Sequence, residues 1–529
     1  MKKIGFIILL MCVIVFDSCE TNKKSKQPAY ESPLHIPVVV NTDSHIPIDS
    51  NHIANFFASF PELKNYDSIV SDLYHRNGFN YIWFDEAGLI EFAHSFYNKV
   101  NLIEDEGVFS RFPYFDKLEG RFNDETENTL SNPETEFMLS CLFIFYVDKI
   151  YSGIDPKKTK AIGWLLPRKQ VSYNVLLDST LLAPDLLNKN EHALFYQYYL
   201  LTDVLKKYRE IEKHGGWDSI EVSPKFKSFK PGDTATAILQ IRNKLFITGD
   251  LAINNQSTTY DPDLLSAIKK YKSRFGYTPD SLILKKHIEQ MNIPVTEFIK
   301  KIIVNMERCR WVTPGILNAK EYIVVNIPSY KLIFLRDGKR ELESPVVVGS
   351  TIHKTIIFSG DLKYIVFSPY WNVPTSIYNK EIKPAMAKNK NYLESHNMEW
   401  NGGQLRQKPG KNNSLGLVKF IFPNSNNIYL HDTPAKSLFE KENRAFSHGC
   451  IRVGKPRELA IALLKDDENW TPQKIDAAMH AGKERAYSLK EKIPVYIGYF
   501  TAWVNSNGEI QFFNDVYERD TPLFDLLTD

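Results

Sequence analysis

The pattern of apolar residues changes near residue 320, and this change constrains the fold more than any other feature of the sequence. Before it, apolar residues recur every three or four positions, as between Tyr198 and Tyr208, and this spacing predicts helices. After it, β-branched and aromatic runs are separated by turn dipeptides such as Asp337-Gly338, which predicts a mostly β domain that begins with a hairpin. We therefore expect a multi-domain α+β protein.

The helical part is expected to form two units and a connecting helix. In the second unit, Asp261 has the position of an N-cap and Pro262 that of the first helical residue, and Gly276 ends the same helix. The hydrophobic fraction of 43% is enough for several cores. The expected boundaries are residues 51–230 for an all-α domain, 236–294 for the second helical unit, 296–311 for the connecting helix and 320–520 for the β domain.

The N-terminal residues are typical of an export signal. Lys2 and Lys3 precede an apolar run over residues 4–16, which is too short to span a membrane and fits the core of a secretory signal. Cys19 follows a small residue and resembles the lipidated cysteine of a bacterial lipoprotein. We expect residues 1–19 to be a lipoprotein-type signal peptide and residues 20–50 a polar tether, so that the protein is exported to the periplasm and anchored to a membrane. A plain cleaved signal peptide and an uncleaved anchor are the alternatives.

The overall charge bears on one class of partner. The chain has 65 basic and 63 acidic side chains, which leave a net charge of +2. This balance gives no electrostatic case for nucleic-acid binding. We expect no nucleic-acid partner.

One cysteine lies in a setting that suits nucleophilic catalysis. Cys450 follows Gly449 and stands 450 − 431 = 19 positions after His431. A cysteine attacks a carbonyl as a thiolate, so its proton must pass to a base such as an imidazole. Gly449 allows the backbone to bend so that N–H groups beside the thiol can converge on an oxyanion. The residues predict a thiol acyl-transfer site.

Two other interpretations of these residues stay open. A cysteine is often inert core filler, which is what we expect of Cys141 within its apolar run. His431, His448 and Cys450, together with the adjacent Asp432, also form a plausible zinc ligand set, but the segment lacks a second cysteine and a helical His spacing. We expect no metal and no cofactor.

The segments 429–434 and 444–453 together carry a family resemblance. They read Tyr-Leu-His-Asp-Thr-Pro and Arg-Ala-Phe-Ser-His-Gly-Cys-Ile-Arg-Val, and this closely resembles the signature of the L,D-transpeptidases, the YkuD-domain family. The resemblance implies that Cys450 attacks a peptidoglycan stem tetrapeptide, releases the terminal D-alanine and forms a thioester. It also implies that His431 is the base, and that an amine of a second stem resolves the thioester into a cross-link.

The resemblance and the chemistry of the side chains suggest further roles. The N–H groups of Gly449 and Cys450, with the Tyr429 hydroxyl, would hold the oxyanion. Arg452 and Arg444 would bind stem carboxylates, with a structural ion pair as the alternative for each. The remaining expected site residues are Asp432, whose main-chain oxygen would orient the histidine, Ser447, and His448, which is either a hydrogen-bonding strut or a rival base.

The resemblance extends along most of the chain, to the large YcbB-like branch of the family. It implies an N-terminal all-α scaffold domain, a three-helix peptidoglycan-binding-like domain, and a mostly β catalytic domain with an inserted capping segment at residues 376–419. The pairs Tyr271-Lys272 and Asp280-Ser281 depart from the peptidoglycan-binding pattern, so that this domain is either a wall-binding unit or a spacer. The inserted segment is expected to be a lid or a disordered loop.

These observations leave three alternative functions, with the first as the expected one. The first is a peptidoglycan L,D-transpeptidase whose partners are stem peptides and whose inhibitors are carbapenem-type β-lactams. The second is an L,D-carboxypeptidase, in which water resolves the same thioester. The third is a non-catalytic wall-binding lipoprotein with a vestigial cysteine site.

Overall fold

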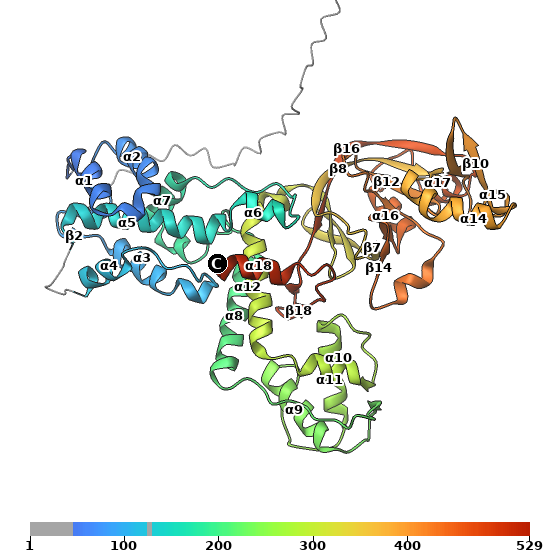
Figure 1. The fold of residues 1–529 in the computed structure, drawn as a ribbon, viewed down its shortest axis with the longest axis horizontal. Helices are drawn as coiled ribbons and strands as arrows, with labels where there is room; N and C mark the ends of the chain where they lie inside the picture. The colour runs from blue at the N-terminus through green and yellow to red at the C-terminus, as the bar shows by residue number, and fades with distance from the viewer. Residues whose placement is uncertain (1–45, 124–129, 529) are drawn as a thin grey trace, which may run out of the picture. The chain divides into compact units, whose positions relative to one another are not determined.

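The structure is a computed structural model that describes residues 46–123 and 130–528. The expected signal peptide, Cys19 and most of the tether lie outside the described residues. In Figure 1 the blue-to-teal part is almost entirely helical, and the yellow-to-red part carries the long strands. The multi-domain α+β class is therefore confirmed.

The N-terminal part is built from helices around an aromatic core. Helix α8 shows why: its buried residues Tyr198, Leu201, Leu205 and Tyr208 repeat at the helical spacing. Helix α5 begins with a capping box and is buried almost throughout. The helices are α1 (Asn51–Ser59), α2 (Asp67–Arg76), α3 (Glu91–Asn101), α4 (Phe115–Phe122), α5 (Asn132–Tyr146), α6 (Pro156–Ala161), α7 (Tyr173–Leu182) and α8 (Gln197–Lys213), with one strand pair, β1 (Phe84–Asp85) and β2 (Gly88–Leu89).

The helical stretch Asn132–Ala161 is long and apolar enough to cross a membrane, but 72% of its apolar window is buried inside the protein. It also contains Cys141, which is fully buried, as the sequence predicted. Both observations are those of a helix in a protein core.

The second helical unit has a core of its own. It contains α9 (Thr236–Thr248), α10 (Pro262–Arg274) and α11 (Lys285–Met291), with β3 (Ser228–Phe229) paired to β4 (Ile283–Leu284). Asp261 caps α10 by accepting a hydrogen bond from Leu264 N, as the sequence predicted. Ile220 belongs to this core as well. The unit therefore begins before residue 236, and the all-α part ends earlier than residue 230. The few apolar residues over 220–229 have no helical spacing that would have signalled this.

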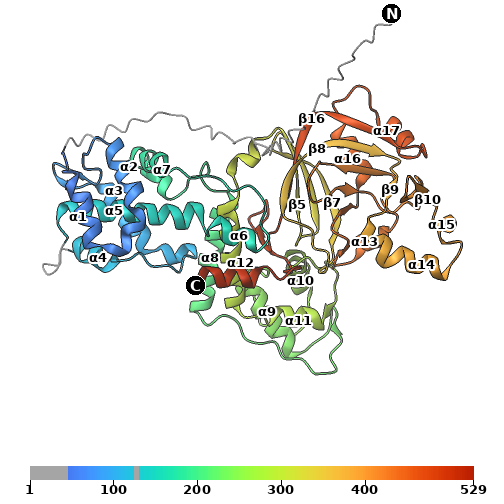
Figure 2. The same ribbon diagram turned by 45° about the horizontal axis from the view of Figure 1, so that its top comes forward.

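The β domain is a sheet of nine strands that closes on itself. The order is β14-β7-β15-β13-β12-β8-β16-β5-β6, and β6 also pairs with β7. The expected hairpin is present, because β5 and β6 pair antiparallel from Glu321↔Arg336 onward. The strands are β5 (Glu321–Asn326), β6 (Lys331–Arg336), β7 (Lys339–Gly349), β8 (Phe358–Phe367), β12 (Val418–Ile421), β13 (Leu430–His431), β14 (Ala445–Ser447), β15 (Ile451–Val453) and β16 (Arg485–Gly498). Helix α16 (Pro456–Leu463) contacts β7 of the sheet, and helix α17 (Pro472–Met479) contacts α16 (Figure 2).

The chain beyond Gly498 leaves this sheet, within the range of residues 320–520 that we expected for the β domain. β17 (Ala502–Val504) and β18 (Ile510–Phe512) form a separate pair. The buried amide of Gln197 in α8 bonds both the N–H and the C=O of Val504, at 2.9 and 2.8 Å. Helix α18 (Asp520–Thr528) and the connecting helix α12 (Val295–Trp311) also contact each other. Burial against helices, which no strand pattern reveals, holds the C-terminal segment.

The inserted segment is folded. It contains α13 (Thr375–Ile377), the π-type turn η6 (Tyr378–Ile382), α14 (Lys383–Lys388) and α15 (Tyr392–Ser395), followed by β10 (Met398–Asn401) and β11 (Gln404–Gln407), which pairs with β9 (Trp371–Asn372). Its small core includes Ile382, Met398 and Leu405. The expectation of a disordered loop is therefore wrong, and the insertion ends before Val418, because β12 belongs to the main sheet.

Candidate active site

Three neighbouring strands bring the polar residues of the motif together. β13 lies between β12 and β15, so that Lys419 and Arg452 are the direct cross-strand neighbours of His431. Residues directly opposite each other in a sheet project from the same face. The imidazole is therefore flanked by two cationic side chains. Lys419 was not among the expected site residues, since we had assigned it to the insertion.

His431 is a buried, neutral base. It is 5% exposed, and its Nδ1–H donates to the main-chain oxygen of Asp432 at 2.6 Å. This bond leaves Nε2 as the basic nitrogen. Burial, the charge of Arg452 and that of Lys419 lower the pKa of the imidazole to about 3, although the bond to Asp432 opposes the change. The side chain is uncharged at pH 7.

The Asp432 carboxylate is held by groups other than the imidazole. Its Oδ2 accepts from Leu417 N at 2.8 Å, and its Oδ1 accepts from Thr433 N at 2.7 Å and from Lys436 Nζ at 2.5 Å. Gly416 permits the close approach, because a Cβ there would lie 2.3 Å from the carboxyl carbon. The side chain of Asp432 thus fixes the local backbone, while its main-chain oxygen orients the base.

The Cys450 thiol lies beside Tyr429. Both the hydroxyl and the main-chain N–H of Tyr429 hydrogen-bond to Sγ, which itself donates to Asn427 O at 3.5 Å. Burial raises the pKa of Cys450, and the Tyr429 contacts and Arg452 oppose the increase. The thiol is therefore protonated at pH 7 and needs a base. Across residues 46–123 and 130–528, its hydrogen bonds do not include one to His431.

The N–H of Gly449, which we had expected to bind the oxyanion, already forms a hydrogen bond within the loop before the nucleophile. Gly449 N–H donates to Ser447 Oγ at 3.2 Å, because a serine hydroxyl two residues earlier can reach it. Ser447 Oγ in turn donates to Cys450 O at 2.5 Å. Gly449 has φ +112°, in the region that favours glycine. Within the described part of the chain, Cys450 N–H donates no hydrogen bond, so it can serve an oxyanion.

Two residues outside the motif brace this loop. Thr355 Oγ1 donates to Gly449 O at 2.8 Å and accepts from Gly349 N at 2.9 Å. Tyr517 OH accepts from Thr355 N at 3.0 Å and donates to Gly349 O at 2.7 Å. Sequence reasoning missed both residues, because neither lies near the motif in the chain and no local pattern marks them.

His448 faces the inserted segment. Its Nε2 lies 2.8 Å from Glu381 Oε1 of η6, and its ring lies 4.9 Å from that of His353. The side chain is 41% exposed. This placement suits a strut between the insertion and the nucleophile loop, and it gives the rival-base interpretation no support.

The two expected arginines differ in their surroundings. Arg444 Nε donates to Lys441 O at 2.7 Å and so supports its own loop. Burial lowers the pKa of Arg452, and Cys450 opposes this change. Among the residues described, Arg452 forms no ion pair, which leaves its guanidinium free to bind an anion.

The zinc interpretation finds no support in these positions. His431 Nδ1 is bound to a carbonyl oxygen, and His448 is turned to Glu381. In the described ranges no three His, Cys, Asp or Glu side chains gather as a metal site would require.

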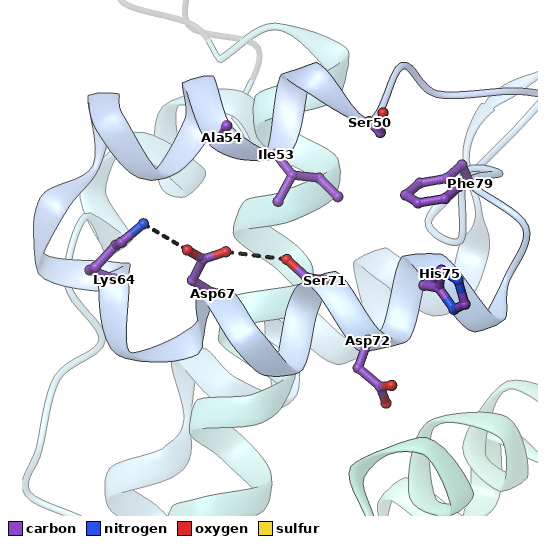
Figure 3. Close-up of a pocket in the computed structure, with 9 residues that line it drawn as sticks. All are labelled: Ser50, Ile53, Ala54, Lys64, Asp67, Ser71, Asp72, His75 and Phe79. Atoms are coloured by element: carbon purple, nitrogen blue, oxygen red, sulfur yellow. Dashed lines mark hydrogen bonds and ion pairs between the residues drawn. The ribbon is translucent and has the colours of Figure 1, made fainter.

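A cavity is also present among residues that lie far from the motif in the sequence. It has a volume of about 550 Å³ and is lined by residues of α1, of the 3-10 helix η1 (Pro61–Tyr66) and of α2, with Ser50 and Phe79 from the adjoining segments, as shown in Figure 3. Asp67 there is bound by Lys64 Nζ at 2.6 Å and by Ser71 Oγ at 3.2 Å. Because Lys64, Asp67 and Ser71 satisfy one another and none of the lining residues belongs to the motif, we assign the cavity no function.

Two family models match the chain. Residues 320–475 match the L,D-transpeptidase catalytic domain (YkuD), and residues 68–205 match the Scaffold domain. A Haemophilus influenzae protein named as an L,D-transpeptidase is 36% identical over 242 residues, which cover 42% of this chain and 48% of that protein. The chain thus matches about half the length of this relative.

Solved structures show only weak likeness. An L,D-transpeptidase from Mycobacterium smegmatis is 13% identical, covering 34% of this chain and 58% of the other, with a TM-score of 0.20. One from Stackebrandtia nassauensis is also 13% identical, covering 51% and 94%, with a TM-score of 0.21. These scores add nothing to the assignment, which depends on the family models and the Haemophilus relative. Residues 320–475 are therefore similar to the L,D-transpeptidase catalytic domain, and residues 68–205, which precede them, are similar to the Scaffold domain.

Proposed function

We propose that the protein is a peptidoglycan L,D-transpeptidase that cross-links stem peptides through a thioester on Cys450. One observation supports this most strongly. The protonated thiol of Cys450 directly precedes β15, the neighbour of the strand β13 that carries the buried neutral imidazole of His431; a main-chain oxygen holds this imidazole, and both residues lie within the segment that matches the catalytic-domain model. Such a pair can transfer a proton as the sulfur attacks, without a preformed ion pair.

The reaction has two halves. Cys450 Sγ bonds to the carbonyl carbon between the L and D centres while its proton passes to His431 Nε2, after the thiol turns from Tyr429. The Cys450 N–H and the Tyr429 hydroxyl stabilise the oxyanion. When the intermediate collapses, the C–N bond breaks and the leaving D-alanine takes the proton from His431. In the second half the amine of another stem attacks the thioester and gives a proton to His431 Nε2; the C–S bond then breaks, and Sγ takes this proton back and leaves as the thiol.

The surroundings have supporting roles in this proposal. Arg452 binds a stem carboxylate. The folded insertion over 376–417 covers the bound donor and contacts the nucleophile loop through Glu381 and His448. Carbapenem-type β-lactams acylate Cys450. Export to the periplasm with a lipid on Cys19 brings the enzyme to its substrate.

Mass spectrometry of digested peptidoglycan tests the function. Wild-type protein and Cys450→Ala are incubated with disaccharide-tetrapeptide. Dimers that have lost one D-alanine, formed only by the wild type, support the transpeptidase. Tripeptide monomers alone would identify an L,D-carboxypeptidase, and unchanged substrate, with binding to intact wall, would identify a wall-binding protein.

A further inference from the structure

A small pocket of about 150 Å³ opens beside the nucleophile. It is lined by Lys419 and Ile421 of β12, by Tyr429, by Leu415 and by residues 370–372. Tyr429 also hydrogen-bonds to Cys450 Sγ. The pocket therefore shares a wall with the reacting atom.

Lys419 is the cation of this pocket. Its side chain is only 16% exposed, and the carboxylate oxygen Oε2 of Glu484 lies 3.7 Å from Nζ, beyond a normal hydrogen bond. That same Oε2 already accepts from Tyr370 N at 2.8 Å. Burial lowers the pKa of Lys419, and Glu484 opposes the change. A desolvated ammonium with one distant, shared carboxylate is stabilised by a further anion.

The position of Lys419 separates it from the other cation of the site. His431 stands between Lys419 and Arg452 in the strand register. Two anionic groups of one substrate can therefore be held on opposite sides of the base. Arg452 does not line the pocket, so that a carboxylate inside the pocket meets Lys419.

We propose that this pocket is the subsite for the leaving residue of the acyl donor and that Lys419 binds its terminal carboxylate. The inference rests on the proposed function and names the part of the substrate that this site recognises. The volume is below the range of about 300–1,000 Å³ for whole ligands and suits one small residue. The low exposure of the Lys419 side chain, 16%, strengthens a contact between charges at this point.

Three synthetic donors test the proposal: a tetrapeptide with free carboxylates, its C-terminal carboxamide, and a variant amidated at the side-chain carboxyl of the third residue. We expect Lys419→Met to lower kcat/KM for the free acid by about tenfold to a hundredfold, the usual loss for a hydrogen bond between charged groups. The C-terminal carboxamide should react equally with both proteins. Lys419→Arg should recover part of the loss.

Each other result decides the question. If the loss disappears with the side-chain amide instead, Lys419 binds that carboxylate and the assignment to the leaving residue is wrong. If Lys419→Met slows all three donors equally, no carboxylate is bound there. Glu484→Gln tests whether the effect of Lys419→Met comes only from loss of the Lys419–Glu484 ion pair. This variant removes the pair and should leave the preference among the three donors unchanged. Lys465→Met, at an exposed lysine, is the matched control.

A binding measurement separates this inference from the proposed function. Calorimetry with Cys450→Ala, with and without Lys419→Met, compares affinity for the free acid and the C-terminal carboxamide without any turnover. A preference for the free acid that requires Lys419 would support the subsite even if the wild type released no D-alanine. Equal affinities would refute the subsite even if cross-links formed.

Discussion

Replacing Asp432 by asparagine separates the two roles of this residue. The substitution keeps the main-chain oxygen that orients His431 but removes the carboxylate that accepts from Leu417 N and Thr433 N. The amide oxygen can accept from only one of the two N–H groups. The loss is one charge-assisted hydrogen bond, about 1.5–3 kcal/mol, and the pair with the half-exposed Lys436 adds about 0–1 kcal/mol.

The expected result is a less stable protein with an intact base. For a domain of this size the combined loss corresponds to a fall of about 3–16 °C in the Tm of the catalytic domain. The rate of acylation by a carbapenem, followed by intact-protein mass spectrometry, should fall by less than about tenfold, whereas His431→Ala should lose about a hundredfold to ten-thousandfold. Lys436→Met is the control that cuts the ion pair alone. A folded Asp432→Asn variant as inactive as His431→Ala would refute the reasoning.

Three further predictions concern the same site. Cys450→Ala should abolish the single carbapenem adduct seen by mass spectrometry, and an adduct that survives would disprove the assignment. Because the pKa of His431 is about 3, the acylation rate should stay constant from pH 7 to pH 5; a loss centred near pH 6.5 would contradict it. The same low pKa means that the unfolded chain binds a proton that the native state does not bind. The free energy of unfolding should therefore decrease as the pH is lowered below about 6.5. Shortening the insertion within residues 383–407 should reduce cross-linking more than acylation by a small β-lactam, and equal effects on both would show that it is merely structural.

The sequence predicted the motif because its chemistry is local. The family resemblance was enough to predict that the main-chain oxygen of Asp432 orients the adjacent imidazole of His431. The helices around Tyr198 and Asp261 followed from periodicity and capping. The hydrogen bond from Gly449 N–H to the Ser447 hydroxyl was not predicted. Whether this N–H binds a nearby hydroxyl or an oxyanion depends on the exact geometry of the turn.

Long-range pairing explains what could not be predicted. Lys419 becomes part of the site only through its register with His431, and register between distant strands is set by the whole sheet. Thr355 bonds the nucleophile loop from a position 94 residues before Gly449, and Tyr517, 162 residues after Thr355, supports Thr355 in turn. The boundaries at residues 236 and 419 differ from the structure for the same reason, because Ile220 belongs to the core of the second helical unit and β12 pairs within the main sheet.

The hydrogen bonds of Tyr517 have a consequence for how the protein can be divided. The residue lies beyond the last strand of the closed sheet and 42 positions beyond the end of the family match (517 − 475 = 42), yet it bonds Gly349 and Thr355, and Thr355 in turn holds Gly449. A truncated protein that ends at Gly498 would keep every motif residue and every strand of the sheet but lose this support. The smallest active fragment should therefore extend past Tyr517, and the C-terminal tail is part of the catalytic unit.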